Sequence, residues 1–290
     1  MSDLSLYLAT ILIWGSTWFA IKLQLGVVPP AVSVAWRFLA AAAILLGYAL
    51  WRRLPLRYGQ RDHGWMLLQG VLLFCLNYVG FYLSERQLAS GLVAVICSLM
   101  MIGNIVGMRL FFGVPVQRVN VIGGVLGIAG VVLLFLPELR ALSASGATLT
   151  GIALATGATV SASLGNMVAT RNQRHGLPIL QASGWSMLYG AIITGAAALF
   201  LGEDLRFDLS WRYLGSWAYL VVFGSVLAFG AYLTLMQRIG AHRAGYAMVA
   251  IPVVALLIST AFEDLHWTAN LWAGVALCIV GNVLVLGRRT

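Results

Sequence analysis

Apolar residues occur along this chain in ten long blocks separated by short breaks. Each block has about the 20 residues that a helix needs to cross the hydrocarbon core of a bilayer, and prolines mark several of the breaks. The pattern therefore predicts an all-α polytopic membrane protein with ten transmembrane helices. The blocks span residues 4–25, 30–51, 64–83, 89–112, 118–136, 148–170, 178–201, 212–236, 243–262 and 268–287.

The order of blocks and breaks repeats about halfway along the chain. The apolar runs and the intervening break of residues 88–135 return about 151 residues later, at residues 239–286. At this offset Gly123 aligns with Gly274. A period near half the chain length indicates two copies of one structural unit. We therefore predict a first five-helix repeat, residues 1–140, and a second, residues 141–290, which together form one transmembrane domain.

Composition excludes an ordinary soluble protein and gives no sign of an enzyme. Apolar residues make up 61% of the chain and charged residues 9%, whereas a soluble domain carries roughly 25% charged residues. Cys75, Cys97 and Cys278 each lie inside an apolar block, where packing explains them better than metal binding. No HExxH, GxSxG, GxGxxG or P-loop pattern occurs in a workable context. We expect no catalysis, no metal and no cofactor.

The basic residues are distributed unevenly between the two sets of breaks. Twelve fall on the side of the N-terminus and five on the other side, and the positive-inside rule then places both termini in the cytoplasm. This explains the net charge of +9 without nucleic acid. Because each repeat has an odd number of helices, the second must be inverted relative to the first, a plan that recurs in secondary transporters. The twelve are Arg52, Arg53, Arg57, Arg61, Arg109, Arg118, Arg171, Arg174, Arg238, Arg243, Arg288 and Arg289; the five are Lys22, Arg86, Arg140, Arg206 and Arg212.

Several short features of the chain match a known family. They are Trp14-Gly15-Ser16 followed by Lys22, the opening of the second block from Pro30 to Arg37, and fourth and fifth blocks rich in small residues. In these features the whole chain resembles the ten-helix drug/metabolite transporter superfamily, its EamA family, and within that the aromatic amino-acid exporters of the YddG type. The resemblance implies a bacterial inner-membrane protein with a cavity lined by helices one to four and six to nine, and with helices five and ten at the periphery.

Helical spacing and depth select the side chains that we expect to face such a cavity. Polar groups have no partner in lipid, so they should point inward, and aromatic rings at mid-depth could bind planar or cationic groups. The alternative is that the hydroxyl groups bond to their own backbone and that the rings merely pack helices together. The candidates are Trp14, Trp18, Asn77, Tyr78, Phe81, Tyr82, Ser98, Met101, Thr159, Ser163, Asn166, Tyr189 and Tyr246.

Charged residues and one proline within the blocks are candidates for gates or hinges. Lys22 and Arg37 lie inside apolar blocks, and Glu85 ends the third. An intramembrane charge by default suggests function, here an outer gate or a contact for a substrate carboxylate, although Lys22 could instead snorkel to the interface. Pro252 is near the middle of the ninth block, where it should kink the helix and act as a hinge. The resemblance implies a kink in the fourth helix also, but Met101 stands at the corresponding position.

Together these features predict an exporter of aromatic and other neutral amino acids, and of planar cationic drugs, that works by alternating access. We favour facilitated movement, because neither an acidic residue nor a histidine falls at mid-depth in a block. The alternatives are a proton-coupled multidrug or metabolite transporter and a lipid-handling helix bundle that transports nothing. The expected partners are a small-molecule substrate and membrane lipid, without nucleic acid, for a monomer or weak homodimer.

Overall fold

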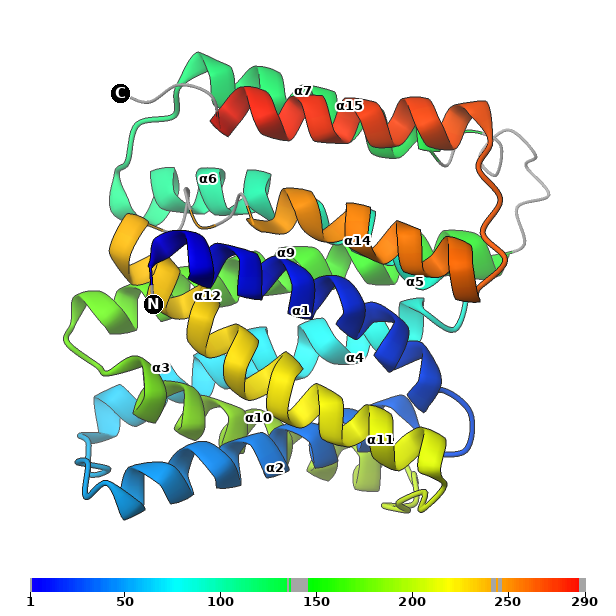
Figure 1. Cartoon of the computed structure of the whole chain (residues 1–290). Helices are drawn as coiled ribbons and strands as arrows, with labels where there is room; N and C mark the ends of the chain where they lie inside the picture. The colour runs from blue at the N-terminus through cyan, green and yellow to red at the C-terminus, as the bar shows by residue number, and fades with distance from the viewer. Residues whose placement is uncertain (1, 135, 137–145, 241–243, 245–246, 287–290) are drawn as a thin grey trace.

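The computed structural model describes residues 2–134, 136, 146–240, 244 and 247–286, and helices joined by loops make up this part of the chain (Figure 1). Seven helical segments in it are long and apolar enough to cross a membrane, and three shorter apolar helices accompany them. The predicted all-helical membrane fold with ten apolar helices is confirmed at this level. The seven are Asp3–Gln24, Pro30–Trp51, Gln60–Ser84, Ser90–Phe112, Gly146–Arg174, Ile179–Phe200 and Trp211–Ile239; the three are Val121–Leu133, Ala250–Phe262 and Ala269–Gly281.

The helices follow the predicted order, and three of them are divided into shorter segments. The third and eighth each contain a π-helical segment, and the fourth is broken in its middle. The segments are α1 (Asp3–Gln24), α2 (Pro30–Trp51), α3 (Gln60–Gln69), η1 (Gly70–Leu76), α4 (Asn77–Ser84), α5 (Ser90–Ser98), α6 (Met100–Phe112), α7 (Arg118–Leu134), α9 (Gly146–Arg174), α10 (Ile179–Phe200), α11 (Trp211–Tyr219), η2 (Leu220–Leu227), α12 (Ala228–Ile239), α14 (Ala247–Phe262) and α15 (Ala269–Leu286).

Two helix boundaries differ clearly from those read off the sequence. The third helix begins at Gln60 instead of residue 64, and the sixth continues to Arg174 instead of residue 170. In both places the added turn is polar, with Gln60, Arg61 and Asp62 at one end and Arg171 to Arg174 at the other. An apolar block ends where the hydrocarbon ends, but a helix continues as far as its backbone hydrogen bonds do.

The fourth helix breaks without a proline, and the ninth runs through one. Leu99 separates α5 from α6 and accepts hydrogen bonds from the backbone N–H groups of Ile102 and Gly103, at 2.9 and 3.3 Å. Pro252 lies inside α14, which is continuous from Ala247 to Phe262. The fourth helix is therefore interrupted even though it has no proline at position 101.

The helices run roughly parallel to one another in a bundle with two distinct edges (Figure 1). At one edge α7 packs along α15, and at the opposite edge α2 packs along α10. The backbones approach closely at the first edge, because a Cβ added to Gly130 would lie 2.6 Å from the carbonyl oxygen of Gly274. Small residues permit such contacts in membrane proteins, where the surrounding lipid provides little apolar driving force.

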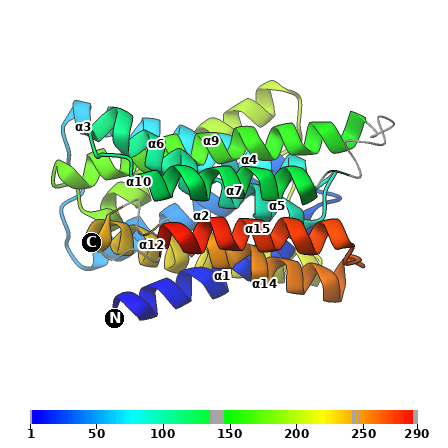
Figure 2. The ribbon, with the colours of Figure 1, turned by 90° about the horizontal axis from the view of Figure 1, so that it is seen from above.

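The two ends of the bundle can be told apart by the termini. The start of α1 and the end of α15 lie at the same end in both views (Figures 1 and 2); we call this the N-terminal end. The opposite end, where α1 and α4 finish and α5 begins, we call the distal end. An even number of crossings returns the chain to the side on which it began. That the N-terminal end is cytoplasmic stays a prediction.

Candidate functional site

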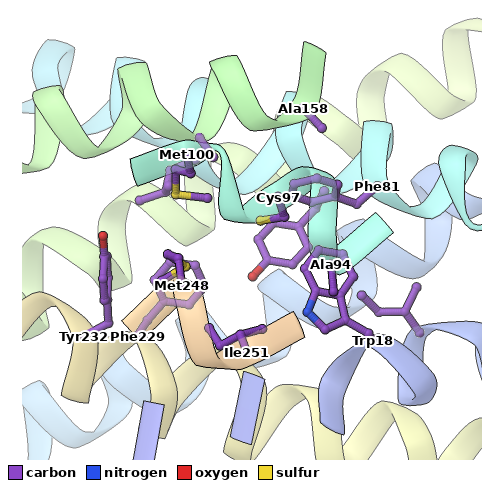
Figure 3. Packing of buried hydrophobic residues seen from close by; sticks show 14 of the residues in the cluster. Trp18, Phe81, Ala94, Cys97, Met100, Ala158, Phe229, Tyr232, Met248 and Ile251 are labelled. Atoms are coloured by element: carbon purple, nitrogen blue, oxygen red, sulfur yellow. The ribbon is translucent and has the colours of Figure 1, made fainter. Parts of the chain in front are cut away.

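A small cavity lies at the centre of the bundle. Its volume is about 50 Å³, counted as the space open to the centres of water molecules, so it holds a few waters and no larger molecule. Figure 3 shows several of the surrounding side chains, among them Trp18, Phe81, Phe229 and Tyr232. The lining residues are Trp14, Thr17, Trp18, Ile21, Leu73, Asn77, Tyr78, Phe81, Ala94, Cys97, Ser98, Met100, Asn166, Phe229, Tyr232, Met248 and Ile251.

The structure brings seven of the predicted cavity residues together in this lining. They come from α1, α4, α5 and α9, which supports the use of helical spacing and depth to choose them. Their contact with a substrate stays a prediction. The seven are Trp14, Trp18, Asn77, Tyr78, Phe81, Ser98 and Asn166.

The other predicted residues lie elsewhere. Tyr82, Met101, Thr159 and Ser163 are buried but do not line the cavity. The Thr159 hydroxyl donates to the carbonyl of Ala155 at 2.7 Å, which is the local backbone bond that the alternative interpretation expects. Tyr246 lies outside the described residues.

Tyr189 belongs to a separate aromatic cluster at the N-terminal end. Its hydroxyl lies 2.8 Å from Nδ1 of His63, and its ring stacks on Trp185 at a centroid distance of 5.8 Å. His63 is near the start of α3, as expected from its position outside an apolar block. The prediction that Tyr189 lines the central cavity is wrong, because depth within a helix does not tell which neighbour the side chain meets.

The cavity wall is aromatic on both sides. The ring centroid of Trp14 lies 4.9 Å from that of Phe229 and 5.1 Å from that of Tyr232. Trp18 meets Phe81 edge to face at 5.1 Å. Phe229 and Tyr232 were not predicted to line the cavity, although their spacing of three residues places them on one face of the eighth helix. Rings of this kind can hold a planar side chain by stacking or a cation over their faces.

Two amide oxygens in the cavity lining have no hydrogen-bond donor among the described residues. Asn166 donates through Nδ2 toward Oδ1 of Asn104 at 3.3 Å and the hydroxyl of Tyr232 at 3.4 Å. Its own Oδ1 is buried without a partner among the described residues, and so is Oδ1 of Asn77. Both asparagines line the cavity. A buried acceptor without a donor is costly, so these oxygens can accept hydrogen bonds from a ligand.

Arg37 is buried beside the cavity, with two aromatic rings close to its guanidinium. Its exposure is 1%. The Nε group donates to Oγ of Ser225 at 2.9 Å, and Cζ lies 4.6 Å from the ring centroid of Tyr78 and 5.2 Å from that of Phe38. Nη1 has no hydrogen-bond partner in the described part of the chain.

The distal end is closed by hydrogen bonds that join α1 to the turn after α4, and α5 to α14. The ammonium of Lys22 donates to the carbonyl of Glu85 at 2.6 Å and to that of Leu88 at 3.2 Å. The carboxylate of Glu263 accepts from the backbone N–H of Ser90 at 3.0 Å and from the Ser90 hydroxyl. In this state the ammonium of Lys22 therefore binds backbone carbonyls at the distal end.

Glu85 lies within this closed end in an unusual state. It is 0% exposed, and neither carboxylate oxygen has a partner among the residues described. Glu85 lies one residue beyond the apolar span Gln60–Ser84. Burial raises the pKa of its carboxyl well above the usual range, and the ammonium of Lys22 opposes this rise. The arrangement therefore favours the neutral acid.

Comparison with known proteins gives the family. The EamA-like transporter family model matches residues 1–136 and 149–287. The uncharacterized inner membrane transporter YedA of Escherichia coli K12 is 29% identical over 291 residues, covering 97% of this chain and 89% of that protein. An uncharacterized transporter of Archaeoglobus fulgidus is 26% identical and covers 97% of each chain. A crystal structure with 19% sequence identity superimposes with a TM-score of 0.74 over 100% of this chain and 99% of that one, which supports the fold. The chain belongs to the EamA-like transporter family.

Proposed function

We propose that this protein exports aromatic and other neutral amino acids across the bacterial inner membrane, and that the central cavity is the substrate site. The observation that carries the proposal is the combination of an aromatic wall with unpartnered acceptors on Asn77 and Asn166. An aromatic side chain would stack on Trp14 and Phe229, and an ammonium group would donate to the amide oxygens. Planar cationic drugs would use the same wall through cation–π contacts.

The proposed mechanism is alternating access between two inverted units, residues 1–140 and 141–290. Three observations support the units. The π-segments η1 and η2 occupy matching places about 150 residues apart, and the helix pairs α7 with α15, α2 with α10 and α5 with α14 each join corresponding helices of the two halves. The two stretches matched by the family model also divide the chain there. We place both termini in the cytoplasm from the excess of arginine at the N-terminal end.

Substrate entry requires a movement, because a cavity of about 50 Å³ does not hold an amino acid. We propose that the break at Leu99 and Pro252 in α14 are the hinges, since they lie on the two helices that meet at the distal end. The lining of the cavity in the described residues contains no carboxylate and no histidine, so we favour facilitated movement. One observation favours the proton-coupled alternative: the buried Glu85 carboxyl could carry a proton as the distal end opens and closes.

Flux in proteoliposomes tests this function. Purified protein should exchange labelled L-phenylalanine for internal L-phenylalanine faster than empty liposomes do. Tyr78→Leu should lower the flux several-fold, because losing the ring removes stacking worth roughly 0.5–1.5 kcal/mol beyond its buried area. Tyr189→Leu is the matched control, since its ring lies outside the cavity. The absence of flux for every aromatic amino acid with correctly folded protein would rule out the proposal.

The same proteoliposomes distinguish facilitated movement from proton-coupled movement. If movement is facilitated, an imposed pH gradient leaves the final distribution of L-phenylalanine unchanged. Accumulation against a concentration gradient, driven by protons alone, would establish the coupled alternative.

A further inference from the structure

A π-helical segment supplies the groups that hold Arg37 beside the cavity. In η2 the carbonyl of Gly224 accepts a hydrogen bond from Nε1 of Trp14 at 3.1 Å, and the next residue, Ser225, accepts one from Nε of Arg37 at 2.9 Å. The Ser225 hydroxyl itself donates to the carbonyl of Leu220, five residues earlier, at 3.0 Å. Such π-segments are frequent at functional sites, because they present backbone and side-chain groups that a regular helix would not.

No ion pair of the described residues involves Arg37 in this state, and Glu85, the carboxyl that interacts with it electrostatically, is kept toward its neutral form by burial. The two ion pairs of the described residues, Arg206 with Asp204 and Arg238 with Asp3, lie at exposed positions and do not involve Arg37. A buried guanidinium whose neighbours are hydroxyl groups and rings, without an ion-pair partner, is costly inside a membrane, and such charges are found where a partner or a ligand compensates them. Nη1 is the group that still lacks an acceptor.

Two contacts place this guanidinium next to the cavity. The ring that it covers belongs to Tyr78, which lines the cavity. A Cβ built on Gly224 would lie 3.0 Å from Nη2 of Arg37 and 2.9 Å from Cγ2 of Thr17, another lining residue. The guanidinium and the cavity wall therefore share the space that Gly224 leaves free. A side chain at position 224 would displace one of them.

Asn77 is one of the two cavity residues with an unpartnered acceptor. It directly precedes Tyr78 on α4, and its Oδ1 is buried without a donor. Beside the cavity, then, is a guanidinium whose Nη1 lacks an acceptor, and in the cavity lining are two amide oxygens that lack donors. A substrate carboxylate would accept a hydrogen bond from the guanidinium, and a substrate ammonium would donate to the amide oxygens.

From these contacts we infer that Arg37 is the carboxylate-binding residue of the substrate site, and that the site takes zwitterionic α-amino acids. This rests on the proposed function and adds to it the residue that recognises the carboxylate of an amino-acid substrate, a group that planar cationic drugs lack. Because the cavity is closed in this state, the contact between Nη1 and the carboxylate forms as the site opens to receive substrate. Ser225 is the positioning residue that orients the guanidinium.

Binding of three related ligands to the purified protein tests the inference. L-Phenylalanine has both charged groups, 3-phenylpropionate has the carboxylate alone, and phenethylamine has the ammonium alone. For the wild type, L-phenylalanine should bind at least about tenfold more tightly than phenethylamine, as expected for a hydrogen bond between charged groups. Arg37→Gln should abolish that difference by weakening L-phenylalanine and 3-phenylpropionate while leaving phenethylamine unchanged. Ser225→Ala should weaken the two carboxylates less than Arg37→Gln does.

The outcomes separate this inference from the proposed function. Equal binding of L-phenylalanine and phenethylamine by the wild type would overturn the carboxylate site and leave export of aromatic solutes standing. An Arg37→Gln variant that weakens all three ligands alike would assign Arg37 to packing between α2 and η2 and would also overturn it. If Arg37→Gln does not fold, the wild-type ligand series decides alone. Binding of none of the three ligands would reject the proposed function, and this inference with it.

Discussion

The two ends of the central helices are closed by different chemistry. At the distal end a charged ammonium and a carboxylate make the contacts, from Lys22 to the carbonyl of Glu85 and from Glu263 to Ser90. At the N-terminal end the buried and half-buried contacts are between neutral amides and carbonyls, from Gln173 to the carbonyl of Leu233 at 3.2 Å and from Asn172 to Gln69 at 2.9 Å. The ion pair that joins helices there, Arg238 with Asp3, is exposed, and exposed ion pairs contribute little. Charge-assisted bonds are roughly twice as strong as neutral ones, and the buried Glu85 carboxyl, whose pKa is raised by burial, lies beside them. The distal end should therefore be the more firmly closed and the more sensitive to pH.

The N-terminal end is also less completely packed. A groove of about 610 Å³ opens there between α1, α2, α10 and the eighth helix, which consists of α11, η2 and α12. It is bordered by Leu6, Leu45, Ile179 and Thr234. At the distal end, by contrast, α5 and α14 are in close contact: a Cβ on Gly91 would lie 3.0 Å from Cα of Leu256. The difference indicates that the structure represents a state closed at the distal end.

The largest expected effect comes from preventing this contact. In Gly91→Val the new side chain would overlap Leu256 and Ser259, and a backbone atom cannot move aside as a flexible side chain can. We expect the distal end to remain open and exchange of L-phenylalanine to stop. Spin-label distances between the turn after α4 and the loop after α14 would report the opening. Gly157→Val is the control, because a Cβ there meets nothing within 4 Å; a closed distal end in Gly91→Val would contradict the account.

Removing the ammonium should have the next largest effect. Lys22→Met keeps the length of the side chain but loses both hydrogen bonds to the carbonyls of Glu85 and Leu88. A hydrogen bond to a charged group contributes about 1.5–3 kcal/mol, so the ratio of distal-open to distal-closed protein should rise roughly tenfold or more. The same spin-label distances measure this ratio. An unchanged ratio would mean that Lys22 contributes nothing to closure.

The pH dependence of closure should be set by Glu85. Burial raises the pKa of this carboxyl well above its usual range, while Lys22 opposes the rise. A raised pKa means that the closed state binds the proton more tightly than a state in which Glu85 meets water. Its contribution to closure is therefore fully present at low pH and is lost as pH rises through the closed-state pKa. Glu85→Gln, which stays neutral, should flatten this dependence.

The other charged groups around Glu85 provide the control for that titration. Lys22, Arg37 and Glu263 all interact with it electrostatically. Glu263 is bonded to Ser90 and Ser259, so Glu263→Gln should weaken closure while preserving the pH dependence. If the pH dependence persists in Glu85→Gln and disappears in Glu263→Gln, then Glu263 causes it, and the attribution to Glu85 is wrong.

The smallest effect is expected at the N-terminal end. Gln173→Met removes one neutral hydrogen bond, to the carbonyl of Leu233, worth about 0.5–1.5 kcal/mol. The N-terminal end should open a few-fold more often, a shift opposite in direction to that of Lys22→Met, and without any dependence on pH. Labels on the loop before α3 and the end of α12 would measure it. A shift larger than that of Lys22→Met would reverse the comparison between the two ends.

The sequence predicts the helices well because the bilayer leaves an apolar segment few alternatives. It does not predict the π-segments or the break at Leu99, because these depend on neighbours. In η1, for example, Gly70 packs directly against the backbone of Ser186 on another helix. Periodicity chose Trp14, Tyr78 and Asn166 for the cavity, but it identifies a face of one helix and not the partner across from it.

The same limit explains the errors in the site. Thr159 of the sixth helix was predicted to face the cavity, yet its hydroxyl donates to the carbonyl of Ala155 in its own helix and it does not line the cavity. Tyr232 was missed because nothing in its own helix indicates that Asn166 and Trp14 lie beside it. The burial of Glu85 likewise depends on groups that are distant in sequence, so its position at a helix end gave no sign of it.

The central claim is that one cavity is opened alternately at the two ends, and paired distances at both ends test it most directly. Spin labels across the distal end and across the N-terminal end should be measured in the same purified protein, with and without L-phenylalanine. The account predicts reciprocal populations, in which molecules with a wide distal end have a narrow N-terminal end, and substrate changes the ratio. Both ends fixed at one distance while L-phenylalanine is exchanged, or both wide at once, would contradict it.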